Sequence, residues 1–146
     1  MKTKVFFHSR KGNTKKIAEA IADELEIPLE KVLPAYMPEN MELMFLGAAS
    51  YGSKLDKKIN DFISFLDTTR VRNAALFSTS GKGDDTAIKI MREKLEKQGI
   101  NVLDEHFSCK GKMFLFFNMG KPDSNDVDNA RKFAKDVIEK FIKEEL

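Results

Sequence analysis

The chain has 146 residues, 42% of them hydrophobic, and its 25 basic and 23 acidic residues leave a formal net charge of +2. This length is typical of one domain, so we expect residues 1–146 to form a single domain with its own hydrophobic core. A membrane span needs about 20 consecutive apolar residues, and the sequence contains neither such a run nor the pattern of a signal peptide. We therefore expect a cytoplasmic protein without a membrane span.

Cysteine and histidine content restricts the chemistry further. The single cysteine, Cys109, excludes an internal disulfide, and the two histidines are too few and too far apart to form a metal-binding cluster. We predict no metal site, and we interpret Cys109 as an ordinary thiol because it belongs to no CxxC pair. Any redox chemistry then requires a bound cofactor.

The first predicted strand leads directly into a glycine-containing loop and a helix. Val5–Phe7 is apolar and β-prone, and apolar residues recur at helical spacing over Asn13–Leu25. The intervening loop comprises Ser9, Arg10, Lys11, Gly12, Asn13 and Thr14. Unpaired amides and the helix dipole favour an anion at a helix N-terminus, so this loop is a candidate phosphate site. The alternative is a turn that only caps the helix.

Two further strands are predicted before the middle of the chain. The second lies near Lys31–Ala35, and Pro34, which has no amide to donate, favours a position at the edge of a sheet. Leu43–Ala49 is a continuous apolar run, as expected for a parallel strand buried on both faces. It leads into a second polar loop at Ser50–Ser53.

The same order of helix, strand and loop then repeats. An amphipathic helix is predicted over Leu55–Leu66, and Ala74–Thr79 is the fourth strand. The glycine-rich loop Ser80–Asp85 follows, and one of its aspartates is expected to cap the next helix. Gly99 is a suitable terminator of that helix.

The last third of the chain contains one strand, an ambiguous segment and a helix. Asn101–Phe107 has the mixed polarity of an edge strand, and Asn125–Lys143 has the spacing of an amphipathic helix. The run Met113–Phe117 between them is compatible with more strand, a short helix or a hydrophobic loop, and with either a core position or an exposed docking patch.

Strands that alternate with helices of about 12 to 18 residues predict an α/β fold, a doubly wound parallel sheet with helices on both faces. In such sheets ligands bind outside the carboxyl ends of the strands. The loops after the first, third and fourth strands are therefore expected to converge on one site.

The first loop resembles the FMN phosphate loop of flavodoxins. Ser9, Gly12, Asn13 and Thr14 occupy the hydroxyl, glycine, amide and hydroxyl positions of that pattern, whereas Lys11 replaces the usual small hydroxyl residue. The resemblance implies a five-stranded sheet in the order 2-1-3-4-5 and FMN as the cofactor.

The resemblance also implies a set of cofactor-binding residues. Ser9–Thr14 would hold the phosphate, and the second and third loops would lie on either side of the isoalloxazine ring. The expected residues of those two loops are Ser50, Tyr51, Gly52, Ser78, Thr79, Ser80, Gly81, Gly83 and Asp84. Tyr51 is the candidate stacking residue, with packing on the following helix as the alternative. His8 either lines the site or has a structural role.

The function implied is electron transfer between redox partner proteins through the bound flavin, with no catalytic side chain from the protein itself. Two alternatives stay open: an oxidoreductase of the same fold, of the quinone reductase or protoporphyrinogen oxidase type, and a flavin-free binding module. Flavodoxins are typically acidic, whereas six of the first sixteen residues here are Lys or Arg. We predict partners with acidic docking patches. Nucleic-acid binding is the other interpretation of the basic cluster, but no recognised motif accompanies it.

Overall fold

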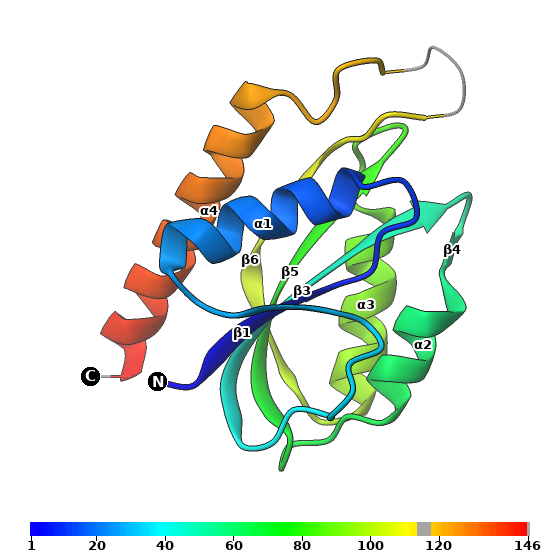
Figure 1. Cartoon of the computed structure of the whole chain (residues 1–146). Coiled ribbons are helices and arrows are strands. Elements are labelled where there is room, and N and C mark those ends of the chain that lie inside the picture. Colours follow the sequence, from blue (N-terminus) through cyan, green and yellow to red (C-terminus); the bar gives the residue numbers. More distant parts are fainter. Residues whose placement is uncertain (114–117, 146) are drawn as a thin grey trace.

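The computed structural model describes residues 1–113 and 118–145, and its strands alternate with helices along most of the chain (Figure 1). In chain order the elements are β1 (Thr3–Phe7), α1 (Asn13–Leu25), β2 (Leu29–Lys31), β3 (Met41–Tyr51), β4 (Lys54–Leu55), α2 (Lys57–Ser64), β5 (Val71–Ser80), α3 (Thr86–Lys97), β6 (Asn101–Lys110) and α4 (Ser124–Glu145). None of these helices combines the length and the apolar composition that a membrane span requires.

Five strands form a parallel sheet in the order β2-β1-β3-β5-β6. This order confirms the predicted 2-1-3-4-5 arrangement of the parallel strands, with edges at β2 and β6. The predicted five-stranded parallel sheet is confirmed, and the structure adds a sixth, two-residue strand, β4, which pairs antiparallel with the end of β3, Ser50 opposite Leu55. A hairpin this short carries no periodicity that a sequence pattern can detect.

The second strand begins two residues and ends four residues earlier than predicted, at Leu29–Lys31 instead of Lys31–Ala35. The Val32 amide still donates to the Phe7 carbonyl oxygen over 2.7 Å. The ladder ends there because Pro34 has no amide to continue it. The chain then reaches β3 through an irregular loop.

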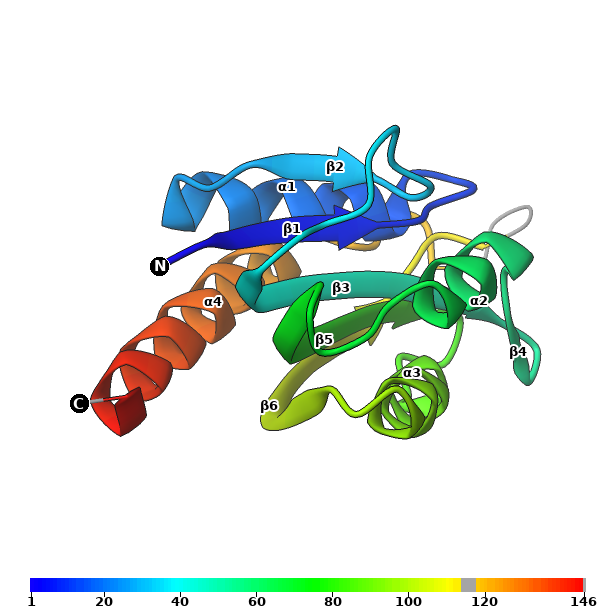
Figure 2. The same ribbon diagram turned by 90° about the horizontal axis from the view of Figure 1, so that it is seen from below.

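Helices cover both faces of the sheet (Figure 2). α1 and α4 pack on one face, where Phe45 and Phe133 meet edge to face with ring centroids 6.1 Å apart. α2 and α3 pack on the other, where the Phe6 and Phe62 rings are 5.1 Å apart. Burial on both faces explains why the middle of each central strand is apolar, Leu43–Ala49 in β3 and Ala74–Phe77 in β5.

The loops that follow β1, β3 and β5 lie together at one end of the molecule, and both termini lie at the other end (Figures 1 and 2). β6 extends to Lys110, three residues beyond the predicted Phe107, and Gly111–Met113 continues without regular structure. Of the Met113–Phe117 run, the residues Phe114–Phe117 lie outside the described part of the chain.

Candidate functional site

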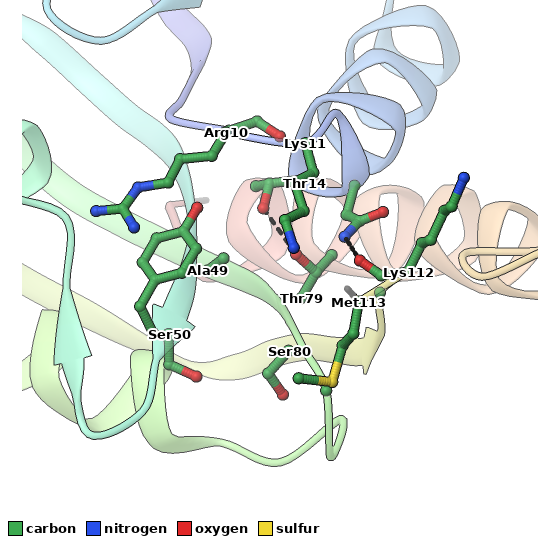
Figure 3. A pocket seen from close by; sticks show the side chains of 14 residues that line it. Arg10, Lys11, Thr14, Ala49, Ser50, Thr79, Ser80, Lys112 and Met113 are labelled. Carbon is green, nitrogen blue, oxygen red and sulfur yellow. Dashed lines mark hydrogen bonds between the residues drawn. The ribbon is translucent and has the colours of Figure 1, made fainter. Parts of the chain in front are cut away.

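Two adjoining clefts open at the carboxyl ends of the strands. The first cleft has a volume of about 440 Å³, part of it open solvent (Figure 3). Its walls come from Ser9–Lys11, Asn13, Thr14, Ala49–Tyr51, Thr79–Gly81 and Gly111–Met113. The second cleft, of about 1080 Å³, is lined by Ser50, Gly52, Ser53, Ser80, Gly81, Lys82, Asp84, Thr86 and Met113. Ser50, Ser80, Gly81 and Met113 belong to both, so the clefts share a wall.

The first cleft meets the N-terminus of α1, where backbone amides are available to a ligand. Gly12 is the N-cap residue with φ +90°, and no side chain caps this helix. Within the described part of the chain, the amides of Asn13, Thr14 and Lys15 have no acceptor. The Ser9 hydroxyl oxygen accepts from the Gly12 amide over 3.0 Å, which holds the loop in a tight turn. These free donors and the positive end of the helix dipole favour an anion.

Hydroxyl and ammonium groups complete the donor set. Thr14 and Thr79 are buried, and their hydroxyl oxygens lie 2.8 Å apart, which ties α1 to β5 (Figure 3). Because a hydroxyl both donates and accepts, each retains hydrogen-bonding capacity toward a ligand. Lys11 also lines this cleft. Amides, hydroxyls and a cation around a helix N-terminus fit a phosphate monoester.

Tyr51, at the end of β3, lines the first cleft with Arg10 over its ring. The Arg10 guanidinium carbon is 3.7 Å from the ring centroid, a cation–π contact. Asp56 holds the guanidinium through its Oδ2 atom, 2.9 Å from Nε and 2.7 Å from the terminal nitrogen. Arg10 is therefore committed to Tyr51 and Asp56 and does not reach toward the α1 amides. Burial raises the pKa of Tyr51, so its hydroxyl stays protonated.

Asp56 also connects this pair to α2 and to His8. Burial favours the neutral carboxyl, but hydrogen bonds from the Lys58 amide and from Arg10 outweigh that effect and lower the pKa of Asp56. His8 is buried behind it, with Nε2 at 3.7 Å from Asp56 Oδ1. Burial lowers the pKa of His8; the Asp56 carboxylate opposes this shift, and the nearby cations add to it. His8 lines neither cleft. Its role is therefore structural, as a buried neighbour of Asp56.

Most of the predicted site residues come together here: all but Gly12, Ser78 and Gly83 line one of the two clefts. Gly12 is the N-cap residue of α1 and does not line the cleft. Ser78 is fully buried in β5, and its hydroxyl lies 3.0 Å from that of Ser108. Gly83 packs against Lys110.

The sequence prediction missed one wall of the site, Gly111–Met113. This segment reaches the first loop because the Asn13 side-chain amide donates to the Lys112 carbonyl oxygen over 2.8 Å. Asn13 therefore fastens the two segments together instead of pointing a free amide at a ligand. No local signal identified this wall, because the predicted last strand ended at Phe107, four residues before Gly111.

Asp85 and Cys109 lie outside the two clefts. Asp85 precedes α3 as predicted but makes no side-chain cap. Its carboxylate accepts from the Ser108 hydroxyl over 2.7 Å and contacts His106 Nε2 at 3.0 Å. Burial raises the pKa of Cys109 to about 12, so this thiol stays protonated at neutral pH.

The amino-acid sequence is similar to that of a known protein family and to that of one archaeal protein. A family model described as a flavodoxin domain matches residues 4–116. A protein of Methanocaldococcus jannaschii, described as uncharacterized, is 35% identical over 138 residues, with 86% of this chain and 90% of that protein covered.

The fold of the chain is similar to the folds of solved structures. A flavodoxin from the domain Archaea superposes with a TM-score of 0.76 at 22% identity, covering 96% of this chain and 98% of that one. Oxidised Flavodoxin 2 from Bacillus cereus superposes with a TM-score of 0.73 at 21% identity, covering 96% and 99%.

Proposed function

The chain belongs to the flavodoxin family, and we propose that it binds FMN in the two clefts and carries electrons between redox partner proteins. The observation that carries this proposal is the uncapped N-terminus of α1, whose first two residues, Asn13 and Thr14, line a cleft between polar loops. When bound, FMN supplies the redox chemistry, and the protein supplies binding, orientation and electrostatics.

Each wall has its own part in binding. The amides of Asn13, Thr14 and Lys15, the hydroxyls of Ser9 and Thr14, and the Lys11 ammonium would hold the phosphate. Ser50 and Tyr51 on one side, and Ser80 and Gly81 on the other, would enclose the rest of the molecule and exclude water from it.

The positive charge around the clefts bears on the partner proteins. We take residues 1–146 as one FMN-binding domain that acts in the cytoplasm. Arg10, Lys11, Lys82 and Lys112 all line the clefts, so a partner that approaches the cofactor would meet positive charge. Acidic patches on the partner would complement it, and association would slow as salt rises.

The first test is binding of FMN and of riboflavin, which lacks the phosphate. We expect the purified protein to bind FMN more tightly than riboflavin. Ser9→Ala combined with Thr14→Ala should weaken FMN binding by about 1.5–3 kcal/mol for each charge-assisted hydrogen bond lost, and should leave riboflavin affinity nearly unchanged. Thr79→Ser, which keeps the hydroxyl beside Thr14, is the matched control. Equal FMN affinity in the double variant and the control would remove this loop from the proposal.

The second test separates a carrier from an enzyme. A carrier passes electrons from a reductase to an acceptor protein, whereas an oxidoreductase turns over a small substrate such as a quinone. We expect the reduced protein to reduce an acceptor protein with an acidic surface faster than it reduces a quinone. A faster quinone turnover contradicts the carrier function without affecting the FMN site.

A further inference from the structure

We propose that Met113 binds the flavin ring system, and that anchored residues around it hold it in position. Met113 ends the segment that follows β6, Gly111–Met113, which is the wall that the sequence did not predict. The inference rests on the proposed function and adds to it a fourth segment that contacts the cofactor.

The segment is fixed to both neighbouring loops. The Gly111 amide donates to the Ser80 carbonyl oxygen over 2.9 Å, and Asn13 holds the Lys112 carbonyl over 2.8 Å. The Asn118 side-chain amide donates to the carbonyl oxygens of Gly81, at 2.8 Å, and Gly111, at 3.2 Å. Met113 therefore follows directly on residues held by both the phosphate loop and the third loop.

The Met113 side chain lies where the two clefts meet. It lines both, and Figure 3 shows it across the first cleft from Ser50. Its sulfur lies over Gly81, where any β-carbon would overlap it, so Gly81 provides the space for this side chain. Met113 is nonetheless 45% exposed, and an apolar side chain held half in water is stabilised by any apolar surface that covers it.

The side chains of the cleft walls indicate which apolar surface covers Met113. Among the described residues that line the second cleft, Met113 is the only one with a large apolar side chain. If the phosphate lies at α1, the flat ring system extends toward the wall that both clefts share. A thioether is polarizable and makes favourable contacts with aromatic rings, so Met113 suits the ring in shape and in chemistry.

The test compares two exposed methionines, using both flavins as probes. Met113→Ala should raise the Kd for FMN and for riboflavin by the same factor, about three- to tenfold, because the lost contact is to the ring. Met119→Ala is the matched control, since Met119 is 64% exposed and lines neither cleft. Met113→Leu should recover part of the affinity. Equal Kd values for Met113→Ala and Met119→Ala would overturn the inference.

A footprint on the unaltered protein gives an independent readout. In the dark, peroxide should oxidise both methionines of the cofactor-free protein to the sulfoxide, which mass spectrometry detects. FMN should slow oxidation of Met113 and leave that of Met119 unchanged. Equal rates for Met113 with and without FMN would contradict the contact. If the parent protein binds no FMN, both this inference and the proposed function fail. If only the Met113 results are negative, the proposed function stands.

Discussion

Tyr51 has one face of its ring under the Arg10 guanidinium and still lines the first cleft. Asp56 holds the guanidinium from the other side, so the ring is kept in a fixed orientation by charge as well as by packing. A rotamer that is fixed in advance loses little entropy when a ligand stacks on it. This arrangement favours Tyr51 as a stacking residue over the alternative of simple packing on α2.

Replacement of Tyr51 tests that role. Tyr51→Ala should weaken FMN binding, because it removes an aromatic contact and leaves Arg10 without a partner on one face. The fluorescence of any flavin that remains bound should rise, since stacking on tyrosine quenches it. Tyr51→Phe keeps the ring and should retain most of the affinity and the quenching. The same affinity and fluorescence in all three proteins would show that Tyr51 only packs.

His8 predicts a dependence of stability on pH. Burial holds its pKa below 6.5, and the groups that face it are Asp56, Arg10, Lys31 and Lys58. Below pH 6.5 the unfolded chain binds a proton that folded His8 does not yet bind, so the free energy of unfolding falls as pH decreases from 7.5 toward 5.5. Urea unfolding of the cofactor-free protein measures this. His8→Gln should flatten the dependence, whereas His106→Gln should keep it, and equal slopes in both variants contradict the assignment.

At the scale of elements, Asp56 determines where α2 begins. Its Oδ1 atom accepts from the Lys58 amide over 2.8 Å, while Oδ2 binds Arg10. One carboxylate therefore caps a helix and orients the cation beside the first cleft. The predicted start at Leu55 was too early because Leu55 belongs to β4 and the cap follows it.

Two substitutions separate these roles of Asp56. Asp56→Ala removes both the cap and the ion pair, and loss of the cap alone should lower the free energy of unfolding by about 1 kcal/mol. Asp56→Asn keeps an oxygen that can cap, so it should cost less stability. Both should weaken FMN binding, because Asp56 holds Arg10 in place beside the first cleft. Thermal or urea unfolding measures the first effect, and a smaller loss for Ala than for Asn would rule out the capping role.

At the scale of the molecule, the charge around the clefts is mainly positive. Arg10, Lys11 and Lys112 line the first cleft, and Lys82 lines the second together with the carboxylate of Asp84. Full reduction of FMN adds negative charge, which nearby cations stabilise. At an effective dielectric constant of 20 to 80, a cation at about 10 Å contributes roughly 0.4–1.7 kcal/mol before screening.

Removal of one of these charges should change the reduction potential. Lys82→Gln should lower the potential of bound FMN, and the difference from the parent should shrink at high salt. Lys97→Gln, at the far end of α3, is the control and should leave the potential unchanged. A redox titration at two salt concentrations measures all three proteins. An unchanged potential in Lys82→Gln at low salt contradicts the electrostatic explanation.

The strand order was implied by the resemblance of the first loop to flavodoxins. The sequence by itself determined the parallel α/β sheet and the three loops expected to meet at one end. Its signals were local: the buried runs of β3 and β5, the helical spacing after Gly12, and the glycines and hydroxyls at the strand ends. Local signals of this kind act within a few residues, through hydrogen-bonding groups and side-chain periodicity. They therefore identify elements and loops before any distant contact is known.

Only the tertiary structure decided which side chains share a partner. Asn13 belongs to the expected phosphate loop, yet its amide binds Lys112, 99 residues later. Arg10 binds Asp56, and Met113 enters the site because Gly81 leaves room for it. Each of these contacts joins segments far apart in sequence, and its energy depends on distances that folding alone sets. The wall formed by Gly111–Met113 could not be predicted for that reason.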